Sequence, residues 1–428
     1  MDSTMEEGLR SRLRDELRSL LGPRRFQPGP GRSEHLGAAS PQTVAEVRQL
    51  ALLTREARVP IIMRGGMSSP FAGAQASEGL VVSFDNLREI RGVNARARVT
   101  TVQPGVIWHT LIEHLASRGL MLRVYPSSEG FSTVGGFVAQ GGIGIGGYQF
   151  GDIERNVAAV RIVDANGELR QIKGQDLRLV VGAEGRTGLV VEVTLRLQEL
   201  ASMTPLVAGF DSFEEAERCL ADVASQVLPI WSVNLMGPAA AGLQSRQWPD
   251  MALPEGSHAV IFSFRQRDAD LVVSALRGSI LAWSGRLVEV RGDNEDWLVQ
   301  FASLQAQGTT PIPMQFQVPL GRAAEFVGSI RPELLEKLAI EAVVADAGKT
   351  LVLRLFFLDR SAIPETNAGA VRALLALAKR VGGVSYMNGA MYLEEADTIL
   401  PTDRVTDIEA FRRTVDPDNR LNPRRVLG

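Results

Sequence analysis

The chain has 428 residues, which is enough for two or three domains with cores of their own. Its 45% hydrophobic and 22% charged residues are ordinary for a soluble globular protein, and its net charge of −3 excludes the basic field typical of nucleic-acid or anionic-lipid binding. The single cysteine, Cys219, excludes an internal disulfide, cysteine-ligated zinc and an iron–sulfur cluster held by this chain alone.

The N-terminal segment, MDSTMEEGL, has neither the basic nor the apolar region of a secretory signal. No run approaches the ~18 apolar residues of a membrane span, so we expect a cytoplasmic protein without one. Residues 4–21 predict a helix whose leucine stripe packs on the protein's own core. The Gly- and Pro-rich residues 27–37 are expected to form a linker.

Short helices and strands interleave from residue 41 to about residue 200. We expect helices over 44–57 and 107–118, and strands over 59–63, 80–84, 99–102, 157–163, 168–172 and 189–197. The Asn166-Gly167 dipeptide is a strong hairpin signal. Because hairpins and helices mix without strict βαβ order, this part is predicted to be α+β.

The pattern changes after residue 201. We expect strands over 206–210, 230–235, 259–264, 287–290, 313–319, 339–345, 350–358, 383–387 and 390–394, and helices over 212–225, 267–283, 321–329 and 366–381. Antiparallel returns between these units predict a second α+β domain, in which helices cover an antiparallel sheet. The predicted division is 1–36, 37–200, 201–395 and 396–428.

The stretch GGIGIGG, residues 141–147, contains G-x-G-x-x-G at Gly142, Gly144 and Gly147. A dinucleotide loop of the Rossmann kind needs a strand before it and a helix directly after it. Here residues 135–140 are at best a weak strand, and residues 148–152 are too rich in glycine and β-formers to open a helix. The sequence therefore excludes a Rossmann domain.

Two glycine-rich loops could still hold phosphate through successive main-chain N–H groups. The first, Arg64-Gly65-Gly66-Met67-Ser68-Ser69, directly follows a predicted strand. The second is Ser132-Thr133-Val134-Gly135-Gly136, with the glycine run shortly after it. Together they predict a ligand with two anionic groups, such as a pyrophosphate. For either loop alone, the alternative that its glycines only turn corners stays open.

Five motifs carry a family resemblance through their order along the chain. They are PIIMRGGMSS (60–69), VQPGV (102–106), STVGG (132–136), GAEGRTGLV (182–190) and DPDNRLNPRRV (416–426). They resemble the vanillyl-alcohol oxidase/p-cresol methylhydroxylase (PCMH-type) FAD-binding superfamily, especially its glycolate-oxidase-subunit-like and D-lactate-dehydrogenase-like branch. The resemblance covers about residues 41–200 and the last dozen. It implies a PCMH-type FAD-binding domain of two α+β subdomains, followed by a cap domain.

The resemblance also implies how each motif serves FAD. The pyrophosphate loop would be Arg64, Gly65, Gly66, Met67, Ser68 and Ser69, with Pro104 and Gly105 on the adenine side. Ser132, Thr133, Gly135 and Gly136 would run beside the pyrophosphate and ribityl chain, and Gly141 and Gly142 near the flavin. Glu184, Gly185 and Val190 would close the adenosine end, and Asn422 would mark the return of the chain to the FAD domain.

The histidines depart from the family pattern. Covalent members place a histidine in the phosphate loop, where this chain has Ser68 or Ser69, so the FAD is expected to be non-covalent unless a cap residue attaches it. Metal-dependent members cluster histidines near the C-terminal end, whereas His35, His109, His114 and His258 all precede that region. His109 and His114 are ~140° apart around a helix. We expect solvated histidines and no metal site.

Polar groups on cap strands are the candidates for chemistry, because the cap roofs the flavin in the family that the chain resembles. At period two, Tyr386, Asn388 and Tyr392 share one face, and Arg354 lies in an otherwise apolar strand. In one interpretation a tyrosine accepts or relays a hydroxyl proton and Arg354 pairs with a substrate anion. In the other, the tyrosines are half-buried sheet residues and Arg354 pairs with a local carboxylate. Tyr125 and Tyr148 are further candidates to flank the flavin.

Two functions remain open. The first is an FAD-dependent dehydrogenase or oxidase that removes a hydride from a small alcohol or hydroxy acid without a metal. The second is a flavin-binding electron-relay or non-catalytic subunit of a glycolate-oxidase-like complex. The electron acceptor (oxygen, a quinone or a partner protein) and the choice between a homo-oligomer and a hetero-complex are not determined by the sequence.

Overall fold

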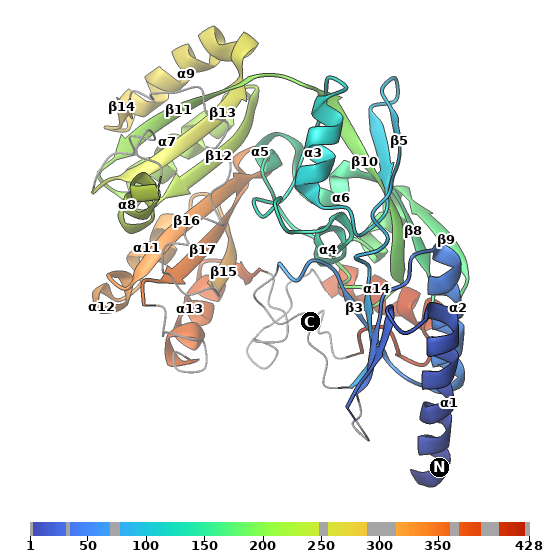
Figure 1. Cartoon of the computed structure of the whole chain (residues 1–428). Helices are drawn as coiled ribbons and strands as arrows, with labels where there is room; N and C mark the ends of the chain where they lie inside the picture. The colour runs from blue at the N-terminus through green and yellow to red at the C-terminus, as the bar shows by residue number, and fades with distance from the viewer. Residues whose placement is uncertain are drawn as a thin grey trace.

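The computed structural model describes residues 3–30, 35–68, 78–247, 256–288, 314–359, 368–386 and 402–423. Two sheets of the N-terminal half lie beside a third sheet formed by residues 203–385, which with its helices is called the cap below (Figure 1). The α+β class with a helix-covered cap sheet is confirmed. None of the helices within these ranges is long and apolar enough to cross a membrane.

The first sheet contains four strands in the order β1-β2-β4-β3. They are β1 (Phe26–Pro28), β2 (His35–Ala39), β4 (Gly79–Ser83) and β3 (Ile61–Arg64), and helices α1 (Ser3–Leu21) and α2 (Val44–Glu56) pack on them. Leu13 and Leu17 of α1 are buried against this core, which confirms the predicted docking of the first helix. The expected linker at 27–37 is wrong, because β1 and β2 pair antiparallel across it.

The second sheet is antiparallel, in the order β5-β6-β10-β8-β9 with β7 paired to the far end of β10. Its strands are β5 (Ile90–Asn94), β6 (Val99–Val102), β7 (Leu120–Leu122), β8 (Val157–Val163), β9 (Leu169–Lys173) and β10 (Leu189–Glu199), with α3 (Trp108–Ala116) nearby. The β8–β9 hairpin turns at Asn166-Gly167 as predicted. Its turn is fixed by Asp164, whose Oδ1 accepts from the amides of Asn166 and Glu168.

Both segments that flank the glycine run are helical, contrary to the sequence prediction. Val134–Gln140 forms α4, capped by the Thr133 hydroxyl, and Gly147–Phe150 forms the single turn α5, followed by α6 (Ile153–Asn156). Buried Val134 and Val138 stabilise α4 by packing, which outweighs the weak helix propensity of its two glycines. The Rossmann exclusion stands, because no strand precedes the run.

The cap sheet is antiparallel, in the order β14-β11-β13-β12-β16-β17-β15-β18. Its strands are β11 (Met203–Phe210), β12 (Ile230–Met236), β13 (His258–Arg265), β14 (Arg286–Val288), β15 (Met314–Pro319), β16 (Leu338–Ala345), β17 (Thr350–Phe357) and β18 (Val384–Ser385). The predicted strand at 390–394 lies outside the described residues.

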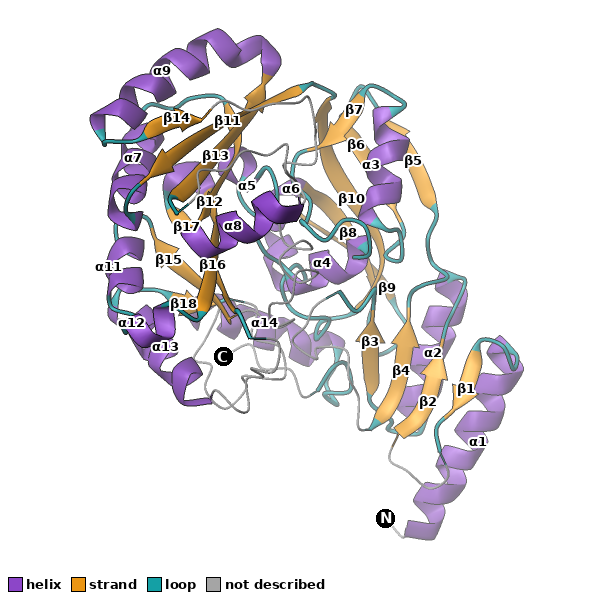
Figure 2. Ribbon diagram, turned by 60° about the vertical axis from the view of Figure 1, so that its left-hand side comes forward, coloured by secondary structure: helices purple, strands orange, loops and turns teal. Residues whose placement is uncertain are grey.

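Helices cover the two faces of the cap sheet unequally. The outer face carries α7 (Phe213–Ser225), α9 (Ala269–Ala282), α11 (Ala323–Gly328), α12 (Pro332–Leu335) and α13 (Ala368–Arg380), as Figure 2 shows. The inner face carries α8 (Pro238–Gln247), which the sequence did not predict, over Met236, Ile261 and Phe356. The rest of the inner face is turned toward the N-terminal half.

The C-terminal segment returns to the first sheet. Helix α14 (Thr402–Val415) is followed by a strand-like stretch beside β3, in which the Ile61 amide donates to Arg420 O and the Asn422 amide donates to Ile61 O. Arg186 on the N-terminal half forms a 2.6 Å ion pair with Glu409 of α14. The end of the chain thereby holds the N-terminal half together after the cap is complete.

Candidate functional site

The first glycine loop offers a row of open main-chain donors. Among the described residues, no group accepts a hydrogen bond from the amides of Gly65, Gly66, Met67 or Ser68. Met67 adopts a left-handed backbone with φ +52°, a geometry that makes neighbouring amides converge into an anion-binding concavity. The loop directly follows β3, whose last residue is Arg64. The Arg64 side chain has no ion-pair partner within the described ranges. Ser69 lies outside the described residues.

The second loop lies so close to the first that neither Gly65 nor Gly66 has room for a side chain. A Cβ on Gly66 would lie 2.4 Å from Phe131 O, and one on Gly65 would lie 2.6 Å from the Thr133 hydroxyl oxygen. Only glycine fits at these two positions without moving the neighbouring loop. The two loops therefore form one continuous surface, as the sequence predicted for a shared ligand.

The amides of the second loop are engaged within the protein. The Val134 amide donates to Val106 O and the Gly135 amide to Pro104 O, both at 2.8 Å, and the Gly136 amide donates to the Thr133 hydroxyl. Ser132 donates its hydroxyl to Ser128 O. This arrangement leaves the first loop as the richer source of free N–H groups for a phosphate.

The residues expected at the adenosine end are held in a tight hydrogen-bonded corner. The Asn422 side chain accepts from the Met63 amide at 2.9 Å and donates to Glu184 O at 2.6 Å. Gly185 follows with φ +75°, and a Cβ there would lie 2.9 Å from the Asn422 side-chain nitrogen. Val190 is buried in β10, and the Gly105 amide donates to Leu87 O. Asn422 thus joins β3 to the 184–185 turn.

The glycine run at 141–147 forms the junction between the N-terminal half and the cap. The Ile143 amide donates to the Tyr386 hydroxyl at 2.5 Å, and Ile143 packs with Val343 and Val352 of the cap sheet. Gly141 and Gly142 have φ of +76° and +125°, which only glycine adopts readily. Tyr148 inserts into the cap core, so it docks the two parts together.

A polar row crosses the inner face of the cap sheet. Glu341 on β16 lies directly opposite Arg354 on β17, and Arg354 lies opposite Gln315 on β15. Val343 lies two residues after Glu341 and Val352 two residues before Arg354, so these side chains share one face of the sheet. Val343 and Val352 pack with Ile143, so this face is the one turned toward the glycine run. Of the two interpretations of Arg354, the pairing with a local carboxylate is present, since its Nη1 lies 3.5 Å from Glu341 Oε2; the pairing with a substrate anion stays a prediction.

Burial shapes the chemistry of this row. Glu341 is completely buried, and this burial raises the pKa of its carboxyl, although the guanidinium of Arg354 opposes the shift. Burial also raises the pKa of Tyr386 to about 12, and the Ile143 amide and the Arg354 charge act in the opposite direction. A tyrosine with such a pKa keeps its proton at neutral pH and is able to donate a hydrogen bond. The interpretation in which Tyr386 accepts or relays a hydroxyl proton stays a prediction.

Sequence reasoning missed Glu341. The signal was the same as for Arg354, because Glu341 is the one charged residue in the apolar strand LAIEAVVA. Tyr125 lies beside Trp231, with ring centroids 6.0 Å apart, at the edge of the junction. The predicted site residues Asn388 and Tyr392 lie outside the described residues.

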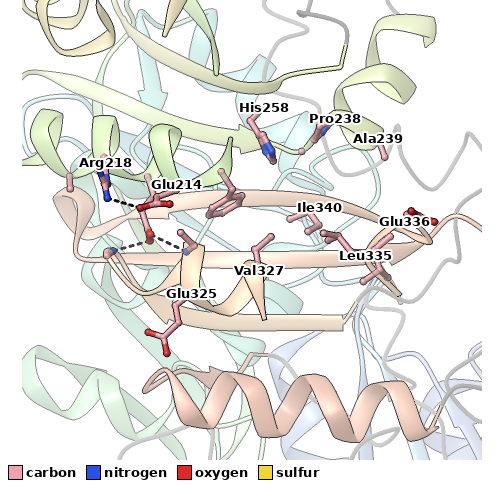
Figure 3. Close-up of a pocket in the computed structure, with 18 residues that line it drawn as sticks. Glu214, Arg218, Pro238, Ala239, His258, Glu325, Val327, Leu335, Glu336 and Ile340 are labelled. Atoms are coloured by element: carbon pink, nitrogen blue, oxygen red, sulfur yellow. Dashed lines mark hydrogen bonds and ion pairs between the residues drawn. The ribbon is translucent and has the colours of Figure 1, made fainter. Parts of the chain in front are cut away.

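A cavity of about 850 Å³ opens on the outer face of the cap, away from the predicted site residues (Figure 3). It lies between α7 and α11, with Ile340 and Leu338 in its floor, on the side of β16 opposite to Glu341. His258 lines it and packs edge-on against Phe213, and burial lowers the pKa of His258. The expectation of a solvated histidine is therefore wrong for His258.

Within the described part of the chain, no three His, Cys, Asp or Glu side chains are grouped so that they could hold a metal ion. Metal independence stays a prediction.

Comparisons with known proteins agree with this geometry. Residues 36–173 match the family described as FAD binding domain. The chain is 24% identical to a D-lactate dehydrogenase of Archaeoglobus fulgidus, over 96% of this chain and 94% of that protein. It is 29% identical to the glycolate oxidase subunit GlcD of Bacillus subtilis, but this match spans only 52% of the chain and 49% of GlcD.

The fold is also similar to that of a solved structure. The structure of p-cresol methylhydroxylase with substrate bound superposes with a TM-score of 0.78, over 97% of this chain and 96% of that one, at 16% identity. The residues are compatible with an FAD phosphate, since the loop after β3 combines four amides without an acceptor among the described residues, a left-handed Met67 and two glycines that leave no room for a Cβ. The chain therefore carries an FAD binding domain over residues 36–173, FAD is its cofactor, and the chain is an enzyme of the oxidoreductase class.

Proposed function

We propose that the chain oxidises a small 2-hydroxy acid by hydride transfer to non-covalently bound FAD, without a metal. The observation that carries the proposal is the position of Arg354 and Tyr386, which lie together on the inner cap face where the glycine run meets it. A guanidinium and a phenol on one buried surface suit a carboxylate and its neighbouring hydroxyl. The names of the relatives, D-lactate dehydrogenase and D-2-hydroxyglutarate dehydrogenase, point to the same substrate class.

In this proposal the first loop holds the pyrophosphate through the amides of residues 65–68, with Arg64 nearby as a counter-charge. The second loop, including Ser132, Thr133, Gly135 and Gly136, shapes the cradle by close approach. The Asn422 side chain positions the turn at Glu184 and Gly185 through hydrogen bonds within the protein, and in this proposal it does not contact the FAD. Bound FAD supplies the two-electron acceptor. The division of the chain at residues 200 and 395 into cofactor and cap units belongs to this proposal, as does a cytoplasmic location.

The cap residues then have separate tasks. Arg354 holds the substrate carboxylate and fixes the orientation of the carbon to be oxidised. Tyr386 accepts from the Ile143 amide and donates a hydrogen bond that orients the substrate. As the hydride leaves for FAD, the proton of the substrate hydroxyl passes to a water molecule. Burial of both side chains excludes bulk water from the reacting group, which strengthens each of these contacts.

A second function is kept because the GlcD relative is named as a subunit. As such a subunit, the chain would bind FAD and pass electrons only within a complex. A quinone, oxygen or a partner protein is then the electron acceptor, and the two functions differ in what reduces the flavin of the isolated chain.

The test is anaerobic reduction of the purified, FAD-loaded chain by D-lactate, glycolate and D-2-hydroxyglutarate. We expect one of them to bleach the flavin, and Arg354→Met to raise the concentration required at least tenfold. The matched control is Arg322→Met, because Arg322 pairs with Glu325 on the exposed side of the cap. Bleaching that occurs only after a partner protein is added would support the subunit function instead. Release of the flavin by acid precipitation tests the non-covalent linkage.

A further inference from the structure

The ion pair between Glu341 and Arg354 is incompletely satisfied for its depth. Glu341 is fully buried, yet the one polar contact that it makes among the described residues, to Arg354, spans 3.5 Å, at the limit of a hydrogen bond. Its second oxygen, Oε1, is buried and accepts from no described residue. A buried carboxylate with one long contact is poorly stabilised in its ionised form. The pair is therefore easily separated by a competitor for the guanidinium.

A comparison within the cap shows how a satisfied buried carboxylate is built. Glu217 on α7 is also buried, and it accepts from the amides of Gly321, Ala323 and Ala324 at 2.8–2.9 Å. Those three donors compensate the loss of water around Glu217. Glu341 has no equivalent set of donors in the part of the chain that the structure describes, so we look for its function at the inner face and not in the stability of the sheet.

We propose that binding of a carboxylate at Arg354 is coupled to protonation of Glu341, so that the site takes up about one proton with each bound substrate anion. This inference rests on the proposed function, which places the substrate carboxylate on Arg354. One guanidinium cannot neutralise two buried carboxylates, so one of the two carboxylates becomes protonated. The carboxylate that receives fewer hydrogen bonds is the easier one to protonate, and we infer that this is Glu341.

Among the described residues, no further charged group lies close enough to Glu341 to compensate an added charge. Within those ranges Arg354 on β17 is the one charge that acts on Glu341, and Tyr386, beyond Arg354, interacts with the charges of Arg354 and Asp152. From the other side of β16, β12 places Met236 opposite Glu341, and α8 packs with its neutral Gln244 buried. Gln315, opposite Arg354, does not titrate. A second anion in this enclosure therefore acts directly on Glu341.

Coupled protonation gives the site a specificity that Arg354 alone does not have. A neutral alcohol brings no charge, so the Glu341–Arg354 ion pair stays as it is. A carboxylate binds to Arg354 only when Glu341 takes up a proton. Affinity for the acid then falls as the pH rises above the pKa of Glu341, by up to about tenfold per pH unit, while affinity for an uncharged analogue does not change.

Calorimetric titration of the oxidised, FAD-loaded protein with oxalate tests this directly, because oxalate has no hydrogen to transfer and the readout is not catalytic activity. Titrations are run from about pH 6 to about pH 9, in buffers with different ionisation enthalpies. The dependence of the heat on the buffer gives the number of protons taken up. We expect uptake that rises with pH toward one proton for each oxalate.

The variants separate this inference from the proposed function. Glu341→Gln keeps a neutral side chain of the same shape, and we expect its oxalate affinity to be independent of pH, with no proton uptake. Glu325→Gln, on an exposed helix, is the control and should behave like the wild type. Heat that is independent of the buffer at every pH in the wild type overturns the inference even if the Gln variant fails to fold. Undiminished oxalate binding by Arg354→Met overturns the proposed function itself.

Discussion

The contact between Tyr386 and Ile143 connects sequence positions 243 residues apart and sets how the cap meets the glycine run. Tyr386→Phe removes the hydroxyl and leaves the buried Ile143 amide without an acceptor. An unpaired buried N–H costs about 1–3 kcal/mol, so we expect the free energy of unfolding to fall by that amount. If Tyr386 also donates to the substrate, kcat/KM should fall about 3- to 10-fold as well.

Tyr148→Phe is the matched control for this prediction. Tyr148 is as buried as Tyr386, and burial raises its pKa to about 12 as well, yet within the described ranges its hydroxyl has no hydrogen-bond partner. We expect Tyr148→Phe to change the free energy of unfolding by less than about 0.5 kcal/mol. Denaturant unfolding followed by intrinsic fluorescence measures both variants. Equal losses in the two variants would refute a special contribution of the contact to Ile143.

Three further predictions follow from the site. Gly66→Ala places a Cβ 2.4 Å from Phe131 O, so FAD affinity measured by ultrafiltration should fall at least tenfold, whereas Gly92→Ala, with open space around it, should leave it unchanged. Asn422→Ala removes the hydrogen bonds to Met63 and Glu184 that hold the C-terminal segment against β3, so the melting temperature should fall. A fall no larger than that of a surface variant would contradict this role of Asn422. Because burial raises the pKa of Glu341 in the folded state, its contribution to stability is fully present below the ordinary pKa of a carboxyl and is lost as the pH rises through the pKa of the folded state. The free energy of unfolding of the wild type should therefore decline toward neutral pH, and that of Glu341→Gln should not.

The period of the hydrophobic residues and the spacing of the turns between them were sufficient to predict most helices and strands of the cap. Strands β16 and β17 were expected within a residue of their observed bounds, because their continuous apolar runs are separated by a short turn. The partner of Arg354 was missed, although the register of the predicted hairpin identifies it, since pairing Ala345 with Thr350 places Glu341 opposite Arg354. A charged residue in each of two consecutive apolar strands was therefore a readable signal.

Other features were decided by contacts that a single sequence does not reveal. Helix α4 has two glycines in seven residues and a Thr133 cap, and its stability comes from burial of Val134 and Val138. The hydrogen bond from Ile143 to Tyr386 depends on how the cap docks. The engagement of the Gly135 amide by Pro104 depends on the approach of a loop from an earlier part of the chain.

The central claim is that this chain uses Arg354 to present the carboxylate of a hydroxy acid to its FAD. The most direct measurement compares anaerobic bleaching of the flavin by D-lactate, glycolate and D-2-hydroxyglutarate with bleaching by the corresponding uncharged polyols, in which each carboxyl group is replaced by an alcohol (a diol for the first two acids and a triol for the third). We expect at least one acid to reduce the flavin and its polyol not to do so at the same concentration. Equal reduction by an acid and its polyol would contradict this role of Arg354.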